Sequence, residues 1–363
     1  MGIRAANDAF EKWLAKQLGD NFVKDDIKIK HAKMSKSAFA FLRATYWRWA
    51  EKIFEVCPNL REAPKVLAVG DIHLENFGTW TDREGRIVWG VNDFDEAAEM
   101  PYILDIVRLA SSAVLAATPA HLSRQAICTH ILEGYRFALK TPEALVLDRD
   151  HLWLRKSFIV DEIARKNFWR KIDKEHRAAL ANKNQTHPSS AWLKVFARAL
   201  PDRSISLTYW PHTAGTGSLG RRRWLGYSFW RSGPLLREAK ALVPSAWVRA
   251  QGGKKKMRLN DIARGRYRAP DPWYEATGNV LVRRLSPNNR KLNLEKGDSE
   301  MLLDPHLLHA MGRDLAAIHL GTRGVRADLH ADFSKRRHDW FRAQVDAASK
   351  FVENEYAEWK KSK

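Results

Sequence analysis

Two acidic clusters in the N-terminal part of the chain have residue types and spacing suited to metal-assisted group transfer. The first reads Asp71-Ile-His73-Leu-Glu75-Asn76, and the second reads Asn92-Asp93-Phe-Asp95-Glu96. Residues 65–69 are apolar enough to form a buried strand that enters the first cluster, and residues 85–91 have strand-like composition. A hairpin would bring the two polar loops face to face. Carboxylates at the ends of buried strands are costly unless they bind metal or take part in catalysis.

The chemistry that these loops suggest is phosphoryl transfer. That reaction requires a carboxylate to orient and deprotonate an acceptor hydroxyl, and an Asn and an Asp to hold Mg²⁺ on the nucleotide phosphates. The segment resembles the catalytic loop of aminoglycoside and choline-type kinases, which read H-G-D-x-H-x-x-N followed by I-D-F. On this basis we assign Asp71 and His73 to catalysis, with Asp71 as the base. We assign Asn76, Asp93 and Asp95 to the metal.

Two positions depart from the kinase pattern: Val69 replaces the His before the Gly, and Asn92 replaces an apolar residue before the Asp. The motif also has a rival interpretation, because Asp71-x-His73 begins the motif set of metallophosphoesterases, in which both side chains would bind metal. That class needs a later Gly-Asn-His and more metal-binding histidines. The only Gly-Asn is Gly278-Asn279, which is followed by Val, so the sequence disfavours this class.

A glycine-rich segment forms the second candidate motif. Residues 204–210, 223–230 and 235–243 are predicted strands, and Gly215-Thr-Gly217-Ser218-Leu-Gly220 lies between the first two. A dinucleotide-binding fingerprint would require a helix at the third Gly, whereas a hairpin follows here, as in the glycine-rich loop of kinases. Glycines let the backbone approach phosphates closely, and a lysine on a later strand then reaches the nucleotide. The predicted nucleotide-binding residues are Gly215, Gly217, Ser218, Gly220 and Lys240.

The order of these motifs is unusual, because ordinary kinases have the glycine-rich loop and the lysine before the catalytic loop. The chain resembles the DUF2252 family, uncharacterised bacterial proteins with a kinase-like signature in permuted order. The matching segments follow the family's order over roughly residues 30–320: Lys33-Met34, Ser37–Arg43, Gly70–Gly78, Asn92–Glu96, Asp105–Ala110, Gly215–Arg222, and Lys240 with Pro244-Ser245. Ala38 and Ala241 depart from the family pattern. The resemblance implies an α+β, protein-kinase-like two-lobed fold that uses ATP and Mg²⁺.

Helices must position the two acidic loops. Residues 37–54 are predicted to form one long helix, with Ser35 or Ser37 as a candidate cap. Arg43 among its apolar neighbours needs an acidic or phosphate partner. A strongly apolar helix follows the second loop. Asp105 and Arg108 lie three residues apart on one face of it, so we expect them to pair and to fix the loop that carries Asp93 and Asp95.

The domain organisation follows from these elements. We expect a helix-rich lobe with the catalytic and metal-binding loops in residues 1–203. A β-rich nucleotide-binding lobe should form from residues 204–290, and C-terminal helices in residues 291–363 should pack on the body.

Composition narrows the class of protein. The 363 residues are 45% hydrophobic, and they contain neither an apolar run long enough for a membrane span nor a signal-peptide core at the N-terminus. Cys57 and Cys128 cannot make a disulfide framework. These features predict a cytoplasmic protein without a membrane partner.

The formal net charge of +20 favours anionic partners. The expected partners are a nucleotide and an unidentified acceptor, either a small molecule or a protein. Phosphoryl transfer is the predicted activity, and nucleotidyl transfer would use the same residues. A non-catalytic protein that binds nucleotide or nucleic acid is the alternative. Lys254-Lys-Lys256, Arg258 and the later Arg283-Arg284 could track phosphates, but few aromatic residues interleave with them, which disfavours nucleic acid.

Overall fold

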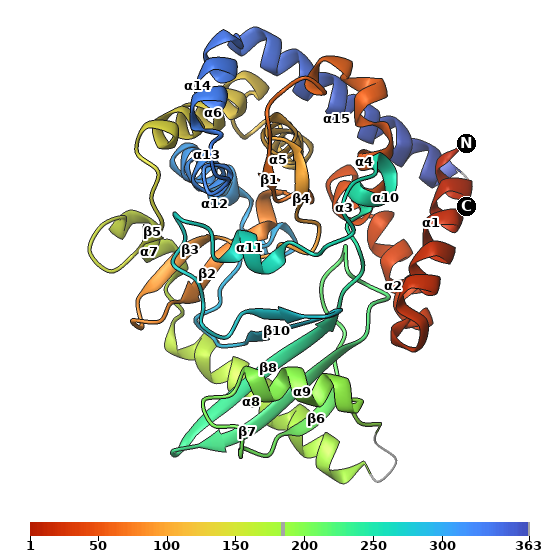
Figure 1. Ribbon diagram of the computed structural model, residues 1–363, viewed down its shortest axis with the longest axis vertical. Coiled ribbons are helices and arrows are strands. Elements are labelled where there is room, and N and C mark those ends of the chain that lie inside the picture. Colours follow the sequence, from red (N-terminus) through yellow and green to blue (C-terminus); the bar gives the residue numbers. More distant parts are fainter. Residues whose placement is uncertain (183–185, 362–363) are drawn as a thin grey trace.

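A five-stranded antiparallel sheet lies at one end of the molecule (Figure 1). The computed structural model describes residues 1–182 and 186–361. The order of strands in this sheet is β6 (Thr208–Pro211), β7 (Arg223–Trp230), β8 (Gly233–Ala241), β10 (Val280–Arg284) and β9 (Glu275–Thr277). The three strands predicted between residues 204 and 243 are therefore present, with the glycine-rich segment connecting β6 to β7.

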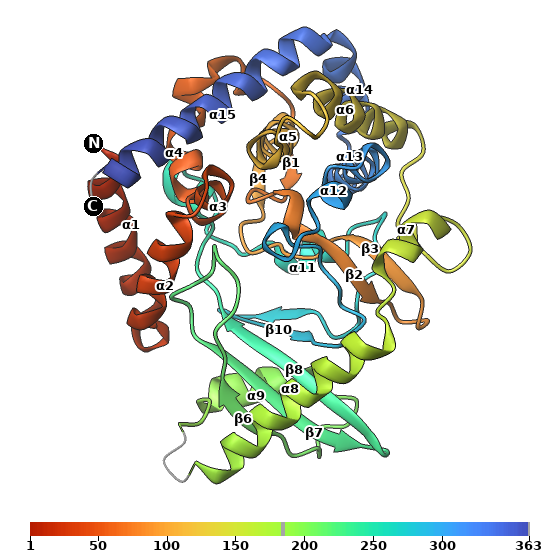
Figure 2. The same cartoon turned by 180° about the vertical axis from the view of Figure 1, so that it is seen from behind.

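Two helices that precede the sheet in sequence pack against it, as Figures 1 and 2 both show. They are α8 (Glu162–Ala181) and α9 (Ser190–Arg198). Ile172 and Ala179 of α8 are buried with Trp210, Leu225 and Tyr227 of the sheet. Residues 162–198, which the sequence analysis grouped with the helix-rich segment, thus lie beside the β-rich one.

The other end of the molecule is helical (Figure 1). The α+β class predicted from the sequence is confirmed, because helices and antiparallel sheets occupy largely separate regions. No helix among the described residues has the length and apolar character needed to cross a membrane. The helices of this region are α1 (Ile3–Leu18), α2 (Lys24–Met34), α3 (Ala38–Ala44), α4 (Tyr46–Val56), α5 (Ile103–Ala116), α6 (Arg124–Lys140), α13 (Pro305–His319), α14 (Arg326–Lys335) and α15 (His338–Lys361).

Two small sheets lie between the helical region and the large sheet (Figure 1). In one, β1 (Lys65–Ala68) pairs antiparallel with β4 (Ala98–Pro101); in the other, β2 (Phe77–Thr81), β3 (Ile87–Val91) and β5 (Leu145–Val146) form three strands. Both acidic loops belong to this middle layer. The first connects β1 to β2 and the second connects β3 to β4. The remaining short helices are α7 (Leu152–Phe158), α10 (Ala246–Gln251), α11 (Leu259–Ala263) and α12 (Ser299–Leu302).

The predicted long helix over residues 37–54 is wrong, because the chain breaks into α3 and α4 at Thr45, whose backbone leaves the helical conformation (φ −123°, ψ 33°). The buried Thr45 hydroxyl donates to the carbonyl of Phe41 at 2.7 Å, a side-chain bond that competes with regular helix geometry. The carbonyl of Leu42 instead accepts a hydrogen bond from Arg108 at 2.9 Å. The predicted cap is confirmed: the Ser37 hydroxyl accepts from the backbone N–H of Ala40 at 3.1 Å.

Helices α6 and α13 cross at two glycines, and this contact holds α13 against the middle layer. A Cβ atom at Gly134 would collide with the carbonyl of His309, and one at Gly312 would collide with the carbonyl of Ile131. Only glycine allows the two backbones to come this close. The crossing matters because α13 carries two buried polar side chains: Asp314, which accepts the N–H of Val91 before the second acidic loop, and His319, which contacts Asp105 of α5.

We predict that Gly134→Ala lowers the free energy of unfolding by about 1–3 kcal/mol, because the methyl group meets backbone rather than a flexible side chain. Urea unfolding followed by circular dichroism measures the change. Gly233→Ala is the matched control, since the nearest atom to its new Cβ is 3.7 Å away; it should change the same quantity by less than about 0.5 kcal/mol. Equal losses in the two variants would contradict the role of this crossing.

Candidate active site

The first acidic loop is held by a buried carboxylate from α5. The backbone N–H groups of Val69 and Gly70 donate to the two oxygens of Asp105 at 2.7 and 2.9 Å. His319 of α13 contacts the same carboxylate at 3.0 Å, and both side chains are fully buried. Gly70 has φ +82°, and a Cβ there would lie 2.6 Å from the carbonyl of Glu96, so the two loops touch where the first one turns.

The side chain of Asp71 is positioned by the other polar residue of α5. Arg108 donates to Asp71 Oδ1 at 2.6 Å, while its guanidinium lies between the rings of Tyr46 and Trp49. The expected Asp105–Arg108 pair is therefore wrong. Asp105 holds the backbone of the first loop and Arg108 holds its carboxylate, so both serve the Asp71 loop rather than the loop that carries Asp93.

The second acidic loop is also held by a buried carboxylate, in this case from α13. Asp314 of α13 accepts the backbone N–H of Val91, the last residue of β3, at 2.7 Å, and it also binds Arg268. Next to it, the N–H of Asn92 donates to the carbonyl of Asn76 at 3.1 Å. The two acidic loops are thus joined to one another immediately before Asp93.

Cations from the large sheet and its glycine-rich connection bind the carboxylates of the second loop. Lys240 of β8 lies 2.5 Å from Asp95 and 3.8 Å from Asp93. Arg221 bridges Asp95 and Glu96, at 3.2 Å from each. The side chain of Lys240, a predicted nucleotide-binding residue, therefore reaches the loop of Asp93.

The glycine-rich segment lies directly over the first loop. A Cβ atom at Gly217 would be 3.3 Å from Asp71 Oδ2 and 2.9 Å from the carbonyl of Arg43. Ser218 is oriented by Arg223 of β7, which donates to its hydroxyl at 2.5 Å. Gly220 faces away from the carboxylates, because its Cβ position is 2.9 Å from Ile27 of α2.

These segments enclose a pocket of about 290 Å³. The lining residues that the sequence analysis assigned to the site are Asp71, His73, Asn76, Asp93, Asp95, Gly215, Gly217 and Ser218. Lys240 and Gly220 are not among the lining residues, although Lys240 contacts two of the lining carboxylates, Asp93 and Asp95. Arg43 also lines the pocket, and its predicted acidic partner is confirmed as Glu75, at 2.6 Å.

The electrostatic environment shifts the pKa values of Asp71 and Asp93, one in each loop, in opposite directions. Burial raises the pKa of Asp71, although Arg108 opposes the rise. Burial acts on Asp93 in the same direction, but Lys240, Lys291 and Arg283 together hold its pKa well below the usual range. Burial and the charges of Arg43 and Arg108 lower the pKa of His73, so its ring is neutral. Asp93 therefore stays ionised, whereas Asp71 is the more basic carboxylate.

The two acidic loops together offer oxygen atoms of the kind that bind a magnesium ion. Asn76 donates its side-chain N–H to the carbonyl of Asp71 at 2.8 Å, which leaves its amide oxygen available. Asp95 Oδ1 is buried and has no hydrogen-bond partner among the described residues. With Asp93, these residues offer two carboxylates and one amide, the oxygen ligands that Mg²⁺ prefers. No three His, Cys, Asp or Glu side chains in the described part of the chain are grouped to hold a metal ion.

Several cations of the site were not assigned to it from the sequence, although Arg283 was expected to be able to track phosphates. Lys291 lines the pocket from the segment after β10, and it forms no ion pair with a described residue. Burial lowers the pKa of Lys291 to about 8, with Asp93 opposing the decrease. Arg283 and Arg223 also line the pocket, and both form ion pairs with Glu238, at 2.6 and 2.9 Å. Their only signal in the sequence was a place in an arginine-rich strand or loop, which does not distinguish a lining residue from a solvated one.

An apolar pocket of about 150 Å³ adjoins the first one, and the two share Arg283 and Lys291. Trp80, Phe94 and Tyr274 contribute aromatic surface to it. Two of its polar atoms, the hydroxyl of Tyr274 and the amide oxygen of Asn92, are buried and have no partner among the described residues. One can donate and the other can accept a hydrogen bond. The combined site therefore has a charged half and an aromatic half.

Comparison with known proteins identifies one family. The family described as uncharacterized proteins conserved in bacteria (DUF2252) matches residues 22–208, more than half of the chain. Comparisons with curated proteins and with solved structures give no match. The matched segment contains both acidic loops and α5, and it ends before the glycine-rich connection. The family resemblance seen in the sequence is thus confirmed, and the chain belongs to the DUF2252 family.

Proposed function

We propose that the protein is a kinase-like phosphotransferase that uses ATP and Mg²⁺ to modify a hydroxyl group of a small molecule or a protein. One observation carries the proposal: Gly217, on a glycine-rich turn between two strands, lies over Oδ2 of Asp71, in a pocket that also contains Asn76 and Asp93. Segments far apart in the sequence thus supply the separate parts that phosphoryl transfer requires.

The proposed fold is a kinase-like two-lobed arrangement with permuted motif order. The large sheet with α8 and α9 would be the nucleotide-binding lobe, and the helical region with the two small sheets would carry the catalytic loops. In support, Arg223 of β7 is paired in register with Lys240 of β8. The glycine-rich turn and the lysine therefore sit on neighbouring strands, as a nucleotide-binding hairpin requires.

The roles of the residues follow from the environments described above. Asn76, Asp93 and Asp95 would hold Mg²⁺, which neutralises phosphate charge. Asp71 Oδ2 would take the proton of the acceptor hydroxyl. The acceptor oxygen then bonds to the γ-phosphorus while the bond from that phosphorus to the bridging β–γ oxygen breaks, and ADP leaves. Lys291, which lacks an acidic partner among the described residues, would bind the phosphate chain.

The adjoining aromatic pocket supports a nucleotide as the donor. It would receive the base between Trp80 and Tyr274, with the phosphates extending past Lys291 towards Asp93. Nucleotidyl transfer would use the same residues, so the products must be identified. Mass spectrometry of acceptors after incubation with ATP distinguishes the two, because phosphorylation adds one phosphoryl group whereas nucleotidylation adds a whole nucleotide.

The metallophosphoesterase alternative is less well supported. It would need Asp71 and His73 to bind metal together. In this structure Asp71 Oδ1 accepts a hydrogen bond from Arg108, and His73 Nδ1 accepts the backbone N–H of Glu75 at 3.2 Å. One candidate ligand atom of each side chain is therefore already used within the protein.

We predict that Asp93→Asn abolishes turnover and weakens magnesium-dependent ATP binding, because it removes a metal carboxylate while preserving the side-chain shape. Calorimetry with Mg-ATP and a coupled ATPase assay measure the two effects. The partly exposed side chain should tolerate the change, so the unfolding midpoint should stay close to that of the wild type. Asp8→Asn, at an exposed position on α1, is the control. Unchanged Mg-ATP affinity in Asp93→Asn would contradict the metal assignment.

Asp71→Asn should separate binding from chemistry. We expect it to leave Mg-ATP affinity within about threefold of the wild type and to reduce turnover by about 10²–10⁴-fold, since a general base and its positioning are typically worth that much. The same two assays apply. If the Mg-ATP affinity of Asp71→Asn falls as much as that of Asp93→Asn, Asp71 is a metal ligand. The metallophosphoesterase interpretation would then be better supported.

The lowered pKa of Lys291 predicts a pH dependence of nucleotide binding. The ammonium group is charged below its pKa of about 8 and loses its charge as the pH rises through that value. The dissociation constant for Mg-ATP should therefore increase between pH 8 and 9.5, by at most about tenfold per pH unit. Lys291→Arg should remove this increase, because arginine stays protonated throughout the range. A wild-type constant that does not change with pH would contradict the role of Lys291.

A further inference from the structure

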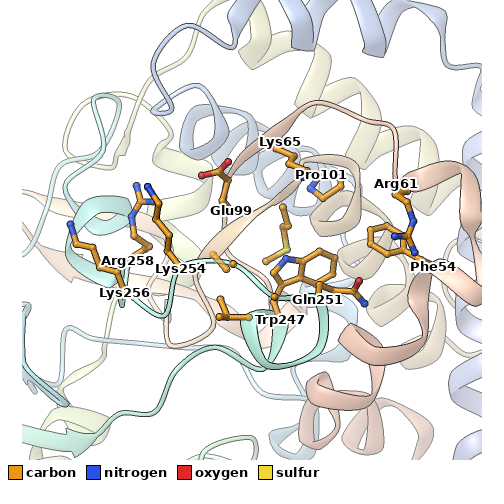
Figure 3. A pocket seen from close by; sticks show the side chains of 15 residues that line it. Phe54, Arg61, Lys65, Glu99, Pro101, Trp247, Gln251, Lys254, Lys256 and Arg258 are labelled. Carbon is orange, nitrogen blue, oxygen red and sulfur yellow. The ribbon is translucent and has the colours of Figure 1, made fainter.

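A second large pocket, of about 550 Å³, lies beside α10 and is separate from the candidate active site. Its walls come from the end of α4, from β4, and from the chain that follows α10 (Figure 3). It shares no lining residue with either half of the site described above. Its volume is within the range of about 300–1,000 Å³ that is usual for small-molecule sites.

The floor of this pocket is apolar. Trp247 and Phe54 meet edge to face, with ring centroids 5.5 Å apart, and Met100 and Pro101 of β4 extend the surface. Figure 3 shows the indole of Trp247 between Arg61 on one side and Lys254, Lys256 and Arg258 on the other. Such a floor favours a ligand with an organic body over a bare inorganic ion.

The rim is strongly cationic at both ends. Lys254, Lys256 and Arg258 lie at one end, and Arg61 lies at the other, where it stacks on Phe54 at 4.3 Å (Figure 3). Arg258 is paired with Asp261 at 2.5 Å. Arg61, Lys65, Lys254 and Lys256 form no ion pair with any residue in the described ranges. The pocket therefore has four unneutralised cations around an apolar floor.

The backbone that carries the lysines has a conformation that favours glycine. Gly252 and Gly253 have φ values of +79° and +116°, and no atom lies within 4 Å of an added Cβ at either position. Their need for glycine is therefore conformational rather than steric. The two residues turn the chain after α10 so that Lys254 and Lys256 reach the rim. Two lysines of the basic run, Lys254 and Lys256, thus line the pocket while remaining exposed to solvent.

We propose that this pocket binds a small organic molecule that carries two or more phosphate groups. Cations at both ends require more than one anionic group, and the compact charge of a lysine ammonium suits phosphate. Glu99, the one acidic lining residue, would accept a hydrogen bond from a hydroxyl or amino group on the organic body. The bounded volume suits one small molecule better than a strand of nucleic acid.

The position of the pocket connects it to the second acidic loop. Glu99 and Met100 belong to β4, which follows that loop directly. Glu96 of the loop accepts the backbone N–H of Ala246 at 2.6 Å and, through its carbonyl, the hydroxyl of Ser245 at 3.0 Å. These contacts hold the start of α10, whose Trp247 forms the pocket floor. A ligand bound here would contact β4, which follows the Asp93 loop, and α10, whose start that loop holds. This is the placement of an effector rather than of the reacting substrate.

Fluorine NMR of protein labelled with 5-fluorotryptophan tests the proposal, with the Trp247 resonance assigned from Trp247→Phe. The probe is ATP in the presence of EDTA, which suppresses binding at the magnesium-dependent site. The Trp247 resonance then reports on binding in this pocket, because Trp247 forms its floor. We expect a saturable shift of the Trp247 resonance. The double variant Lys254→Gln/Lys256→Gln should raise the dissociation constant about tenfold or more. Inorganic tripolyphosphate should bind more weakly than ATP.

The matched control is Lys12→Gln/Lys16→Gln, which removes the same charge from exposed positions on α1; it should change the dissociation constant less than about twofold. Equal weakening by both double variants would overturn the proposal, because it would indicate attraction by overall charge. An unmoved Trp247 resonance, or equal affinity for tripolyphosphate and ATP, would also overturn it. The proposal would also be overturned if a single-stranded oligonucleotide bound more tightly than ATP and both double variants weakened that binding equally. That result would indicate a nucleic-acid surface.

Discussion

Two buried carboxylates support the whole candidate site. Asp105 and Asp314 each accept backbone N–H groups at the end of a strand, directly before the loop with Asp71 and the loop with Asp93. A buried carboxylate is stable only when its oxygens are satisfied, and here the partners are His319 and Arg268 in addition to the backbone. Asp314 and His319 both lie on α13, and the glycine crossing with α6 holds that helix in place.

Balanced charge is the second feature of the site. Most of its arginines and lysines are bound to carboxylates: Arg108 to Asp71, Arg43 to Glu75, Arg221 and Lys240 to the second loop, and Arg223 and Arg283 to Glu238. Such pairs orient side chains more than they stabilise the fold, because desolvation offsets much of their attraction. Lys291 is different, since no described residue pairs with it. Among the described lining residues, Lys291 and the exposed Lys296 are therefore the lysines that remain available to an anion.

The residues with a distinctive motif were the most predictable part of the site. Asp71, Asn76, Asp93 and the glycine-rich turn come together in one pocket, because each follows a short strand whose end faces the same cleft. The Asp105–Arg108 pairing failed for a physical reason: helical spacing allows a local pair, but each side chain found a partner across the interior instead. The helix break at Thr45 was missed for a similar reason, since the carbonyl of Leu42 is needed by Arg108.

By itself, the sequence determined the α+β class, the family, the strands around the glycine-rich turn and the identity of the polar residues in both loops. These properties depend on local composition and short-range spacing, which a linear chain displays directly. Tertiary structure alone decided which cations reach which carboxylates and that α8 and α9 pack on the large sheet. It also decided that Lys291, Lys254 and Lys256 line pockets. Those outcomes depend on contacts between segments distant in sequence, and an exposed lysine and a pocket-lining lysine have the same local signature.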